Sequence, residues 1–542
     1  MALNPFQQIV VKKPKRHVYR LTFDNLLTCD FGNLTPIMCK PVYPNEDWRI
    51  RPEVMIKTMP LRAPIYSRID AYIHYFFVPS RVLMDQNTWE NFITGGLTGL
   101  SLAELPSINS NNLAGQQPGS LADYMNIPTF SVNASGGKLK SALPLLAYKR
   151  IYCDYYQDEQ LDGIEYVPFA GGEITDSSTI TDLLTLRQRA WYKDYFTMSR
   201  PDTQLGAQEV IPVTGQVVSS GDPFRFAQSN SDTVSNIFVR DGYNQEDLTA
   251  DYADVGAGQR YAAPIKTSNG GEVQYYADGL ALDNAGILVN EFRKTMRLQM
   301  LHERDSRGGA RLQESMFHHF GVLGKDSRLQ RAQYLGGVKV PVVIGEIQQT
   351  SAQMVDSAGE EVTPLGTLAG KGTGVSAGKR IKFFSSADHG YVIGILSIMP
   401  KTCYMQGLDR MYWNLDRFDY AWPELSNIGE QAIYKGEIYF DNTDTDNGTF
   451  GYVPQYSWLR FSPSEVHGEF KSTLLHWHNG RKFNSRPSLN SNFVHLTKDG
   501  GYQNMNRIFN VESDEIKGHF ICQILNHVRV KRPISKYGIP TV

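Results

Sequence analysis

The first residues in this sequence that could do chemistry surround a serine in a glycine-rich stretch. GVSAG (374–378) fits the GxSxG pattern that presents Ser376 as a nucleophile, and Asp388 and His389 follow it along the chain. That pattern requires a buried strand before the serine and a helix after it. Here a Gly/Thr-rich loop leads into the strand-like KRIKFFSS. A glycine loop explains the stretch better than a hydrolase site, so we expect no catalytic residues.

Two other stretches contain side chains that can bind metal ions. His476 and His478 would share one face if LLHWHNG forms a strand, but no third ligand is close in sequence. DNTDTDNG (441–448) is rich in side-chain oxygens, yet its spacing does not match the EF-hand pattern. A polar hairpin tip explains this second stretch more simply. We therefore expect no metal and no cofactor.

Basic side chains concentrate at the two ends of the chain. KKPKRHVYR (12–20) precedes the first acidic residue, Asp24, and residues 529–542 hold four basic side chains and no acidic one. Clustered cations bind phosphate groups without reading base sequence. The alternative is that such ends only keep mobile termini soluble. The candidate DNA-facing residues are Lys12, Lys13, Lys15, Arg16, Arg20, Arg529, Lys531, Arg532 and Lys536.

The composition is that of a globular protein. A net charge of −2 argues against a chain that binds nucleic acid over its whole surface, and 41% hydrophobic residues allow a sizeable core. The five cysteines, odd in number and widely spaced, predict neither a disulfide framework nor a zinc site. No signal peptide is visible, and the densest apolar run, 391–400, is about half the length of a membrane helix. We expect a soluble protein made in a cytoplasm.

The elements that would position these residues are mainly strands. Abundant glycine, tyrosine and phenylalanine favour strands joined by elaborate turns. SRIDAYIHYFFVP (67–79) and residues 515–530 alternate between apolar and polar, as half-buried strands do, whereas 391–400 is apolar on both faces. Helical spacing appears in three segments, 143–156, 182–196 and 285–309.

One long segment differs from the rest in composition. Leu205 to Asn284 is rich in Gly, Ser, Asn and Asp, and it holds eleven acidic residues against four basic ones. Pieces such as VIPVTGQVV and EVQYYA are strand-like, so we interpret the segment as a surface excursion of β hairpins. Disorder is the alternative, although valine and tyrosine are commoner here than in disordered segments.

Aromatic residues interleaved with arginines mark candidate subunit interfaces. RLQRAQYLGG (328–337) and GLDRMYWNLDRFDYAWPEL (407–425) combine Trp, Tyr and Arg, which are enriched at interface hot spots. Burial in the core is the alternative for any one of these aromatic side chains. The candidate interface residues are Arg328, Arg331, Tyr334, Arg410, Tyr412, Trp413, Arg417 and Trp422.

Long stretches of the chain resemble the major capsid protein of microviruses, small phages with circular single-stranded DNA. The resemblance lies in PLRAPIYSRIDAYIHYFFVPSR, ALPLLAYKRIYCDYYQDEQL, WYKDYFTMSRP, ERDSRGGARLQESMFHHFGV and YMQGLDRMYWNLDRFDYAWPELSNIGEQAI. WENFITGG, RLQRAQYLGG, HGYVIGILSI and KFNSRPSLNSNF add to it, so that the matches follow one another in order over most of the chain. The gokushovirus-like branch is the most similar.

The resemblance implies a mainly β fold, an eight-stranded antiparallel jelly roll with long loop insertions that contain a few helices. It implies a non-enzymatic shell protein that closes, in sixty copies, into a T=1 icosahedral capsid, with pentamers as intermediates. The domains would be a basic arm (1–23), a core (24–204 and 285–528), an acidic insertion similar to the threefold protrusion (205–284) and a basic tail (529–542). The protein would be assembled in a bacterial cytoplasm and end in the virion.

Physical reasoning adds the partners that such a shell needs. Both chain ends would line the interior and neutralise the DNA, and the acidic insertion would face outward toward a host surface receptor. A separate small basic DNA-packaging protein or an internal scaffold is a further candidate partner. The alternative function is a carbohydrate- or receptor-binding protein outside any shell, since lectin domains also use the jelly roll.

Overall fold

The computed structural model describes most of the chain. The described residues are 15–94, 103–109, 117–128, 138–139, 141–204, 214–219, 225–228, 273–276, 280–286, 289–308, 330–348, 354–355, 361–363, 368–385, 388–496, 505–510, 518–534 and 536–537. They divide between two compact units, one formed by Met1–Thr203 with Lys325–Val542 and the other by Gln204–Gly324.

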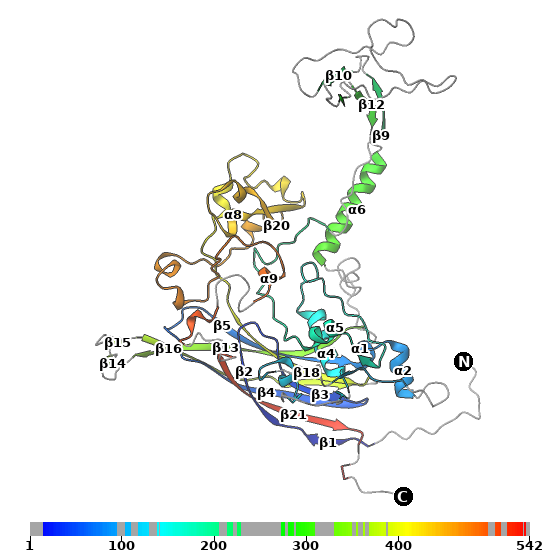
Figure 1. Ribbon diagram of the computed structural model, residues 1–542, viewed down its shortest axis with the longest axis vertical. Helices are drawn as coiled ribbons and strands as arrows, with labels where there is room; N and C mark the ends of the chain where they lie inside the picture. The colour runs from blue at the N-terminus through cyan, green and yellow to red at the C-terminus, as the bar shows by residue number, and fades with distance from the viewer. Residues whose placement is uncertain are drawn as a thin grey trace, which may run out of the picture. The chain divides into compact units, whose positions relative to one another are not determined.

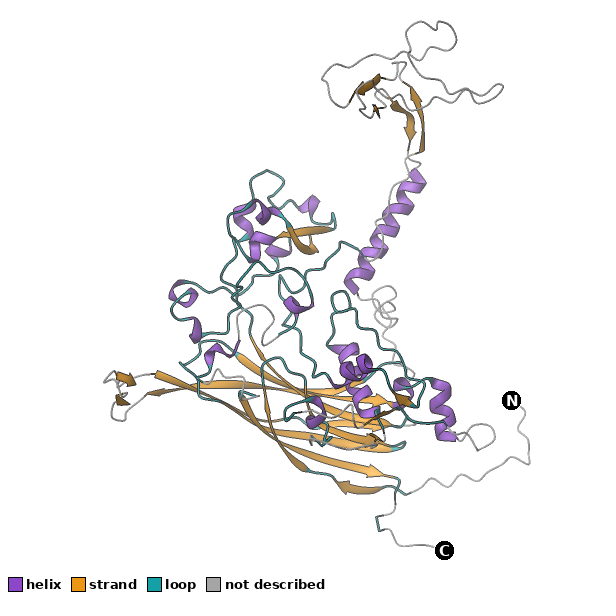
Figure 2. Ribbon diagram, viewed as in Figure 1, coloured by secondary structure: helices purple, strands orange, loops and turns teal. Residues whose placement is uncertain are grey.

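One curled antiparallel sheet dominates the first unit (Figures 1 and 2). Eight strands follow the order β1, β21, β4, β16, β13, β5, β18, β3, while β2 also pairs with β21 and β17 with β4. Their bounds are β1 His17–Arg20, β2 Phe23–Cys29, β3 Thr35–Val42, β4 Glu46–Thr58, β5 Ile69–Pro79, β13 Gln333–Gln348, β16 Leu368–Ala377, β17 Ile381–Ser385, β18 Gly390–Pro400 and β21 Phe520–Arg532. The sheet confirms the predicted fold class.

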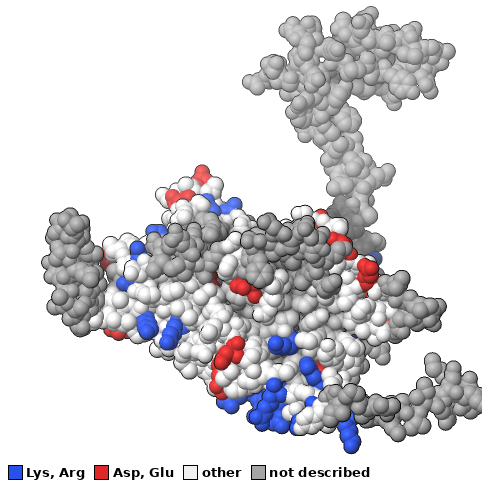
Figure 3. All heavy atoms as spheres, turned by 60° about the horizontal axis from the view of Figure 1, so that its bottom comes forward, with Lys and Arg blue, Asp and Glu red and all other residues white. Residues whose placement is uncertain are grey.

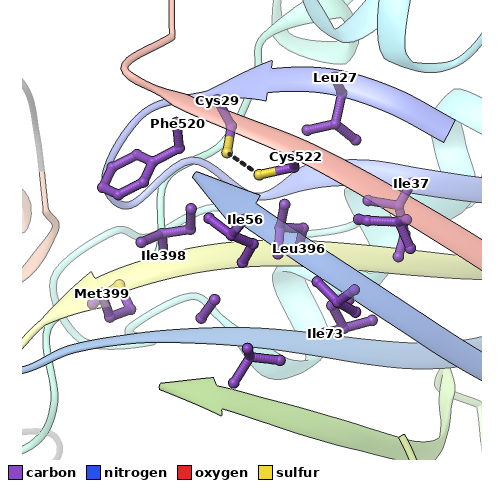
Figure 4. Close-up of a cluster of buried hydrophobic side chains, with 14 of the residues drawn as sticks. Leu27, Cys29, Ile37, Ile56, Ile73, Leu396, Ile398, Met399, Phe520 and Cys522 are labelled. Atoms are coloured by element: carbon purple, nitrogen blue, oxygen red, sulfur yellow. Dashed lines mark hydrogen bonds between the residues drawn. The ribbon is translucent and has the colours of Figure 1, made fainter. Parts of the chain in front are cut away.

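The inner side of the curled sheet carries the largest hydrophobic core. Along β5, Ile69, Ala71, Ile73 and Tyr75 are buried in this core, as their alternation with polar residues predicts. Figure 4 shows side chains of β2, β5, β18 and β21 pointing toward one another in it. The side chain of Asn25 on β2 donates to the carbonyl of Ile37 on β3 at 2.8 Å, so the two ends of the sheet approach each other.

Helices cover the other side of β5 and β18. They are α1 Ser80–Leu83, α2 Gln86–Thr94, α3 Leu121–Tyr124, α4 Leu143–Tyr155 and α5 Ser177–Leu184. A second core joins α4 to the outer side chains of both strands, such as Phe76 and Ile393. This explains why β18 is apolar on both faces, and α4 confirms the helix predicted at 143–156.

The helix predicted at 182–196 is wrong in most of its length. Helix α5 begins earlier, because the side chain of Asp176 caps it by accepting from the backbone N–H of Ser178 and Thr179, and it ends at Leu184. The following residues leave the helical conformation for backbone pairing elsewhere, with Gln188 bridging to Asn33 and Ala190 to His495. Tertiary pairing overrides the local helical pattern here.

Residues 404–496 form a loop-rich region with a third core that includes Phe450 and Phe493. Its elements are β19 Glu430–Tyr434, β20 Thr449–Pro454, α8 Lys435–Ile438, α9 Ser491–Val494 and the 3-10 helices η3 Arg410–Trp413, η4 Pro423–Leu425, η5 Asp444–Asn447, η6 Ser457–Leu459, η7 Gly468–Lys471 and η8 Leu475–Trp477. Elsewhere in the first unit lie η9 Met505–Ile508, β6 Ser107–Asn109, β7 Lys138–Leu139, β8 Glu173–Ile174, β14 Met354–Val355 and β15 Glu361–Thr363.

The second unit contains paired strands and one long helix. Strand β9 (Thr214–Ser219) pairs with β12 (Leu280–Gly286), and β10 (Arg225–Gln228) pairs with β11 (Val273–Tyr276). Strand β11 lies within the predicted piece EVQYYA, and β9 overlaps VIPVTGQVV and ends one residue beyond it. Helix α6, Val289–Gly308, confirms the third predicted helix. The second unit thus holds the acidic segment together with α6.

Candidate nucleic-acid interface

Strands β1, β21, β4 and β17 turn one face toward the core and the other toward solvent. Trp48, Ile50, Val528 and Val530 point into the core and are fully buried or nearly so. Because successive side chains of a strand alternate between faces, their neighbours along each strand point outward. The outward face therefore carries the side chains that alternate with the core residues along each strand.

A row of four cations crosses this outward face. Arg20 on β1 is paired with Arg529 on β21, and Arg529 with Arg49 on β4. Arg49 is in turn paired with Lys382 on β17. Residues paired across an antiparallel sheet lie on the same face, with neighbouring strands about 4.8 Å apart. The register thus aligns four positive charges that are widely separated in sequence.

Further basic residues surround this row. They are Lys15 and Arg16 before β1, Arg51 on β4, Lys379 and Arg380 before β17, and Lys531 on β21. Figure 3 shows Lys and Arg side chains gathered along the lower edge of the molecule. Two carboxylates lie among these residues, with Asp47 3.9 Å from Arg49 and Glu53 3.6 Å from Arg51. The six basic residues named here and the four of the row make ten, and we call these ten residues the basic face.

The basic face has the chemistry of a phosphate-binding surface. Its cations are exposed or half-buried, and ion pairs with exposed carboxylates such as Glu53 hold them only weakly. Cations on a sheet surface neutralise phosphates without reading base sequence and release counterions, which makes binding salt-dependent. The arrangement can therefore hold a polyanion.

The structure brings several predicted DNA-facing residues onto this one face. Arg20, Arg529 and Lys531 lie on it through strand register, Lys15 and Arg16 precede it, and Lys536 is exposed just beyond β21. Lys12 and Lys13 lie outside the described residues. Sequence reasoning missed Lys379 and Arg380, and it also missed Arg49, Arg51 and Lys382. Their alternation with Trp48, Ile50 and Phe383 was the available signal, but register across strands cannot be read from one chain.

Arg532 has a different role from the other predicted DNA-facing residues. It forms an ion pair with the fully buried Glu46 at 2.6 Å, and its guanidinium lies 5.5 Å from the ring centre of Trp48. Burial raises the pKa of the Glu46 carboxyl, and Arg532 opposes that shift. Arg532 thus compensates a buried carboxylate, and we leave it out of the basic face.

The candidate interface residues of 407–425 also divide into residues that bind within their own chain and residues that are exposed. Arg410 forms an ion pair with buried Glu437 at 2.7 Å, and the rings of Trp413 and Tyr434 pack at 5.0 Å. Arg410 and Trp413 thus attach the loop to its own chain. Tyr412, Arg417 and Trp422 are instead exposed, although the Arg417 guanidinium lies 5.0 Å from the Trp422 ring centre.

Exposed apolar side chains accompany these three residues. Leu415 is 89% exposed and Phe418 is 72% exposed. The other large apolar side chains exposed in this loop are Met411, Tyr412, Tyr420, Trp422 and Ile428. A monomer rarely exposes so many large apolar side chains together, and such a patch marks an interaction site. We call residues 411–428 the aromatic loop.

The remaining interface candidates lie near the start of β13. The Arg331 guanidinium lies 5.8 Å from the ring centre of Tyr155 on α4, and Tyr334 remains half exposed beside His74. Tyr334 and His74 line a cavity of about 440 Å³. Burial and the charge of Arg189 lower the pKa of His74 to about 4, so this imidazole is neutral at physiological pH. Arg328 lies outside the described residues.

The residues that resembled a hydrolase site either lie inside a paired strand or contact other side chains of the chain. Ser376 lies inside β16 and is paired with Val54, which is not the strand-to-helix turn of a nucleophile. Asp388 is bound by Arg81 at 3.0 Å, and His389 packs against the rings of Tyr43 and Trp89.

The two metal-like stretches are also explained by contacts within the chain. His478 contacts the carbonyl of Phe470 through Nε2 at 2.8 Å and accepts from the Gly480 N–H through Nδ1, so both ring nitrogens are used. The guanidinium of Arg486 binds Asp441 and Asp446 in the oxygen-rich loop. Within the described ranges, no group of three metal-binding side chains comes together.

Among the helices that the structure describes, none is long and apolar enough to cross a membrane.

Comparison with known proteins places this chain in a family. The chain is 29% identical to capsid protein VP1 of Chlamydia phage 1, over 97% of this chain and 94% of that protein. It is 30% identical to capsid protein VP1 of Bdellovibrio phage phiMH2K, over 90% and 89% of the two chains. Capsid protein VP1 of Spiroplasma virus 4 is 26% identical, over 94% of this chain and 92% of that protein.

These relatives confirm the resemblance to microvirus capsid proteins of the gokushovirus-like branch. A family model described as capsid protein (F protein) matches residues 8–542. Since that match covers nearly the whole chain, this protein belongs to the capsid protein (F protein) family.

Proposed function

We propose that this capsid protein self-assembles into a T=1 shell of sixty copies around a circular single-stranded DNA genome, with its basic face inside. The observation that carries the proposal is the row Arg20, Arg529, Arg49 and Lys382. Family membership supports the structural, non-enzymatic role and a location in the virion. Pentamers are the expected assembly intermediates.

The inward orientation follows from charge and from layering. A shell needs cations toward its genome, and the basic face is a bare sheet surface, whereas helices cover the outer side of β5 and β18. Lys12, Lys13 and Lys536 would extend the basic face along the DNA. A separate small basic packaging protein or an internal scaffold would supplement this charge.

The test neutralises three of the four cations of the row and leaves the fold intact. We expect particles of the triple variant Arg49→Gln, Lys382→Gln, Arg529→Gln to retain single-stranded DNA only at lower salt, with a shallower dependence of the logarithm of affinity on the logarithm of salt. The control carries Lys401→Gln, Arg460→Gln and Lys471→Gln, exposed cations from other parts of the first unit. Equal DNA retention by the two variants at every salt concentration would contradict an inward basic face.

The aromatic loop is the proposed contact between copies. Its exposed Leu415 and Phe418 gain free energy when a neighbouring chain covers them, on the order of 1.5–3 kcal/mol for each side chain that becomes fully buried. The double variant Leu415→Asp, Phe418→Asp should remain a 61.1 kDa monomer in light scattering when the wild-type chain forms particles. Val167→Asp, at another exposed apolar position, serves as the control. Normal particles from the double variant would exclude the loop as an essential contact.

The acidic segment, residues 205–284, is the proposed site of host attachment, since a receptor must be reached from the outside of a closed shell. Its net negative charge also keeps particles apart in solution.

A further inference from the structure

An exposed phenylalanine lies among the cations of the basic face. On β17, Ile381, Phe383 and Ser385 are buried, whereas Lys382 and Phe384 point outward. Phe384 is 54% exposed, so its ring contributes little to the core. Residues two apart on a strand are about 6.6 Å apart and share a face, which places the ring directly beside Lys382.

Cations and one carboxylate lie around this ring. Phe384 is paired with Asp47 on β4, and Asp47 with Lys531 on β21. This second row runs parallel to the four-cation row. The Arg16 guanidinium also lies over this ring, 5.8 Å from its centre. An apolar, flat side chain is thus presented to solvent where polyanions would bind.

Proteins that bind single-stranded nucleic acid combine these two features. A basic groove follows the phosphates, and aromatic side chains beside it stack with unpaired bases. Arginine adds a cation–π contact to such a platform. A duplex cannot use the platform in this way, because its bases are already stacked and paired.

We propose that Phe384, flanked by Arg16, is a stacking platform for an unpaired DNA base whose neighbouring phosphates lie on Arg49, Lys382 and Arg529. The proposal rests on the proposed function, in which this face meets the genome. It adds the reason for a preference for single strands, since the cations alone would hold any polyanion.

The experiment separates stacking from charge. The full-length chain is titrated with a fluorescent oligo-dT and with an abasic strand of the same length and backbone charge. We expect the wild type to bind oligo-dT about tenfold more tightly than the abasic strand. Phe384→Leu should reduce this ratio to about twofold or less and leave the salt dependence unchanged, whereas Phe384→Trp should keep the ratio. Phe461→Leu, at a half-exposed phenylalanine outside the face, is the control.

Three failures are distinguishable. An unchanged ratio in Phe384→Leu, with salt-dependent binding preserved, would overturn the stacking platform and leave the basic face standing. Binding to neither strand by the wild-type chain would overturn both the platform and the proposed inward face. A matched duplex that binds as tightly as oligo-dT would also exclude the platform as the source of single-strand preference.

Discussion

Individual arginines in this protein have opposite roles that depend on burial. Arg20, Arg49 and Arg529 point to solvent, where they can meet phosphate, whereas Arg410 and Arg532 each compensate a buried carboxylate. A buried charge that loses its partner costs far more than an exposed one. Arginines that look equivalent in sequence should therefore differ in how much the same substitution changes the stability of the chain.

Arg410→Met should destabilise the chain itself, whether or not copies assemble. It leaves Glu437 buried without its cation, although the Tyr195 hydroxyl and the Tyr434 N–H still donate to this carboxylate at 2.9 and 2.8 Å. Breaking such a pair costs about 3–5 kcal/mol. The measurement is denaturant unfolding of the unassembled chain at neutral pH. Arg417→Met, at an exposed position of the same loop, should lie within about 0.5 kcal/mol of the wild type.

The pH dependence of stability should change with Glu437→Gln. Burial raises the pKa of Glu437 above its unfolded value despite the opposing charge of Arg410. A carboxyl with a raised pKa stabilises the fold most below its unfolded pKa, and this contribution is lost as pH rises through the folded pKa. The unfolding free energy of the variant relative to wild type should therefore increase from pH 4 to pH 7. A difference that stays constant or falls over this range would show that the pKa is not raised.

At the scale of elements, strand β13 shows how alternation and register determine the effect of a side chain. Val343 is 68% exposed and Val340 is fully buried, on opposite faces of one strand. A shift of register by one residue would exchange the two environments. Substitution at the two positions therefore tests the register directly.

Val340→Thr should destabilise the first unit by about 1–3 kcal/mol, because it places a hydroxyl in the core without a designed partner. Val343→Thr should change stability by less than about 0.5 kcal/mol, because threonine keeps the β-branched shape and its hydroxyl reaches water. Unfolding of both variants in the same denaturant series provides the comparison. Similar losses at the two positions would indicate that the register is wrong.

The elements also show what could be predicted from sequence. Strand β5 and helix α4 follow from apolar periodicity, and β18 follows from an apolar run on both faces, because these elements are buried. Helix α6 follows from its helical spacing, although Phe292, Met296 and Met300 on its apolar stripe remain partly exposed. The segment 182–196 does not, since its backbone pairs with residues distant in sequence. The basic face was predicted only from the chain ends, because its middle, Arg49 and Lys382, depends on which strands become neighbours. Phe384 stayed unnoticed for the same reason.

For the whole molecule, charge is separated by location. The chain ends and the middle strands together build one basic face, whereas the segment 205–284 holds eleven acidic side chains against four basic ones. The basic arm also contributes strand β1, which pairs with β21. Deleting residues 12–20 would therefore remove structure as well as charge, and a charge-neutral arm is the better probe.

Neutralising the arm should lower DNA retention but not assembly. In the variant Lys12→Gln, Lys13→Gln, Lys15→Gln, Arg16→Gln, strand β1 (His17–Arg20) is unchanged, so the sheet keeps its register. Light scattering across a salt series, with and without single-stranded DNA, should show particles of normal size that release DNA at lower salt. Loss of particles without DNA would mean that the arm acts in subunit contacts instead.

Removing most of the acidic segment should separate assembly from host attachment. Ser219 at the end of β9 is paired with Leu280 at the start of β12, so residues 220–279 can be replaced by Asn-Gly, a two-residue turn suited to a β hairpin. This cut removes β10 and β11 and leaves the first unit and α6 unaltered. We expect shells of normal sedimentation that no longer adsorb to host cells. Failure to assemble would assign these residues to subunit contacts, and undiminished adsorption would move the attachment site elsewhere on the shell.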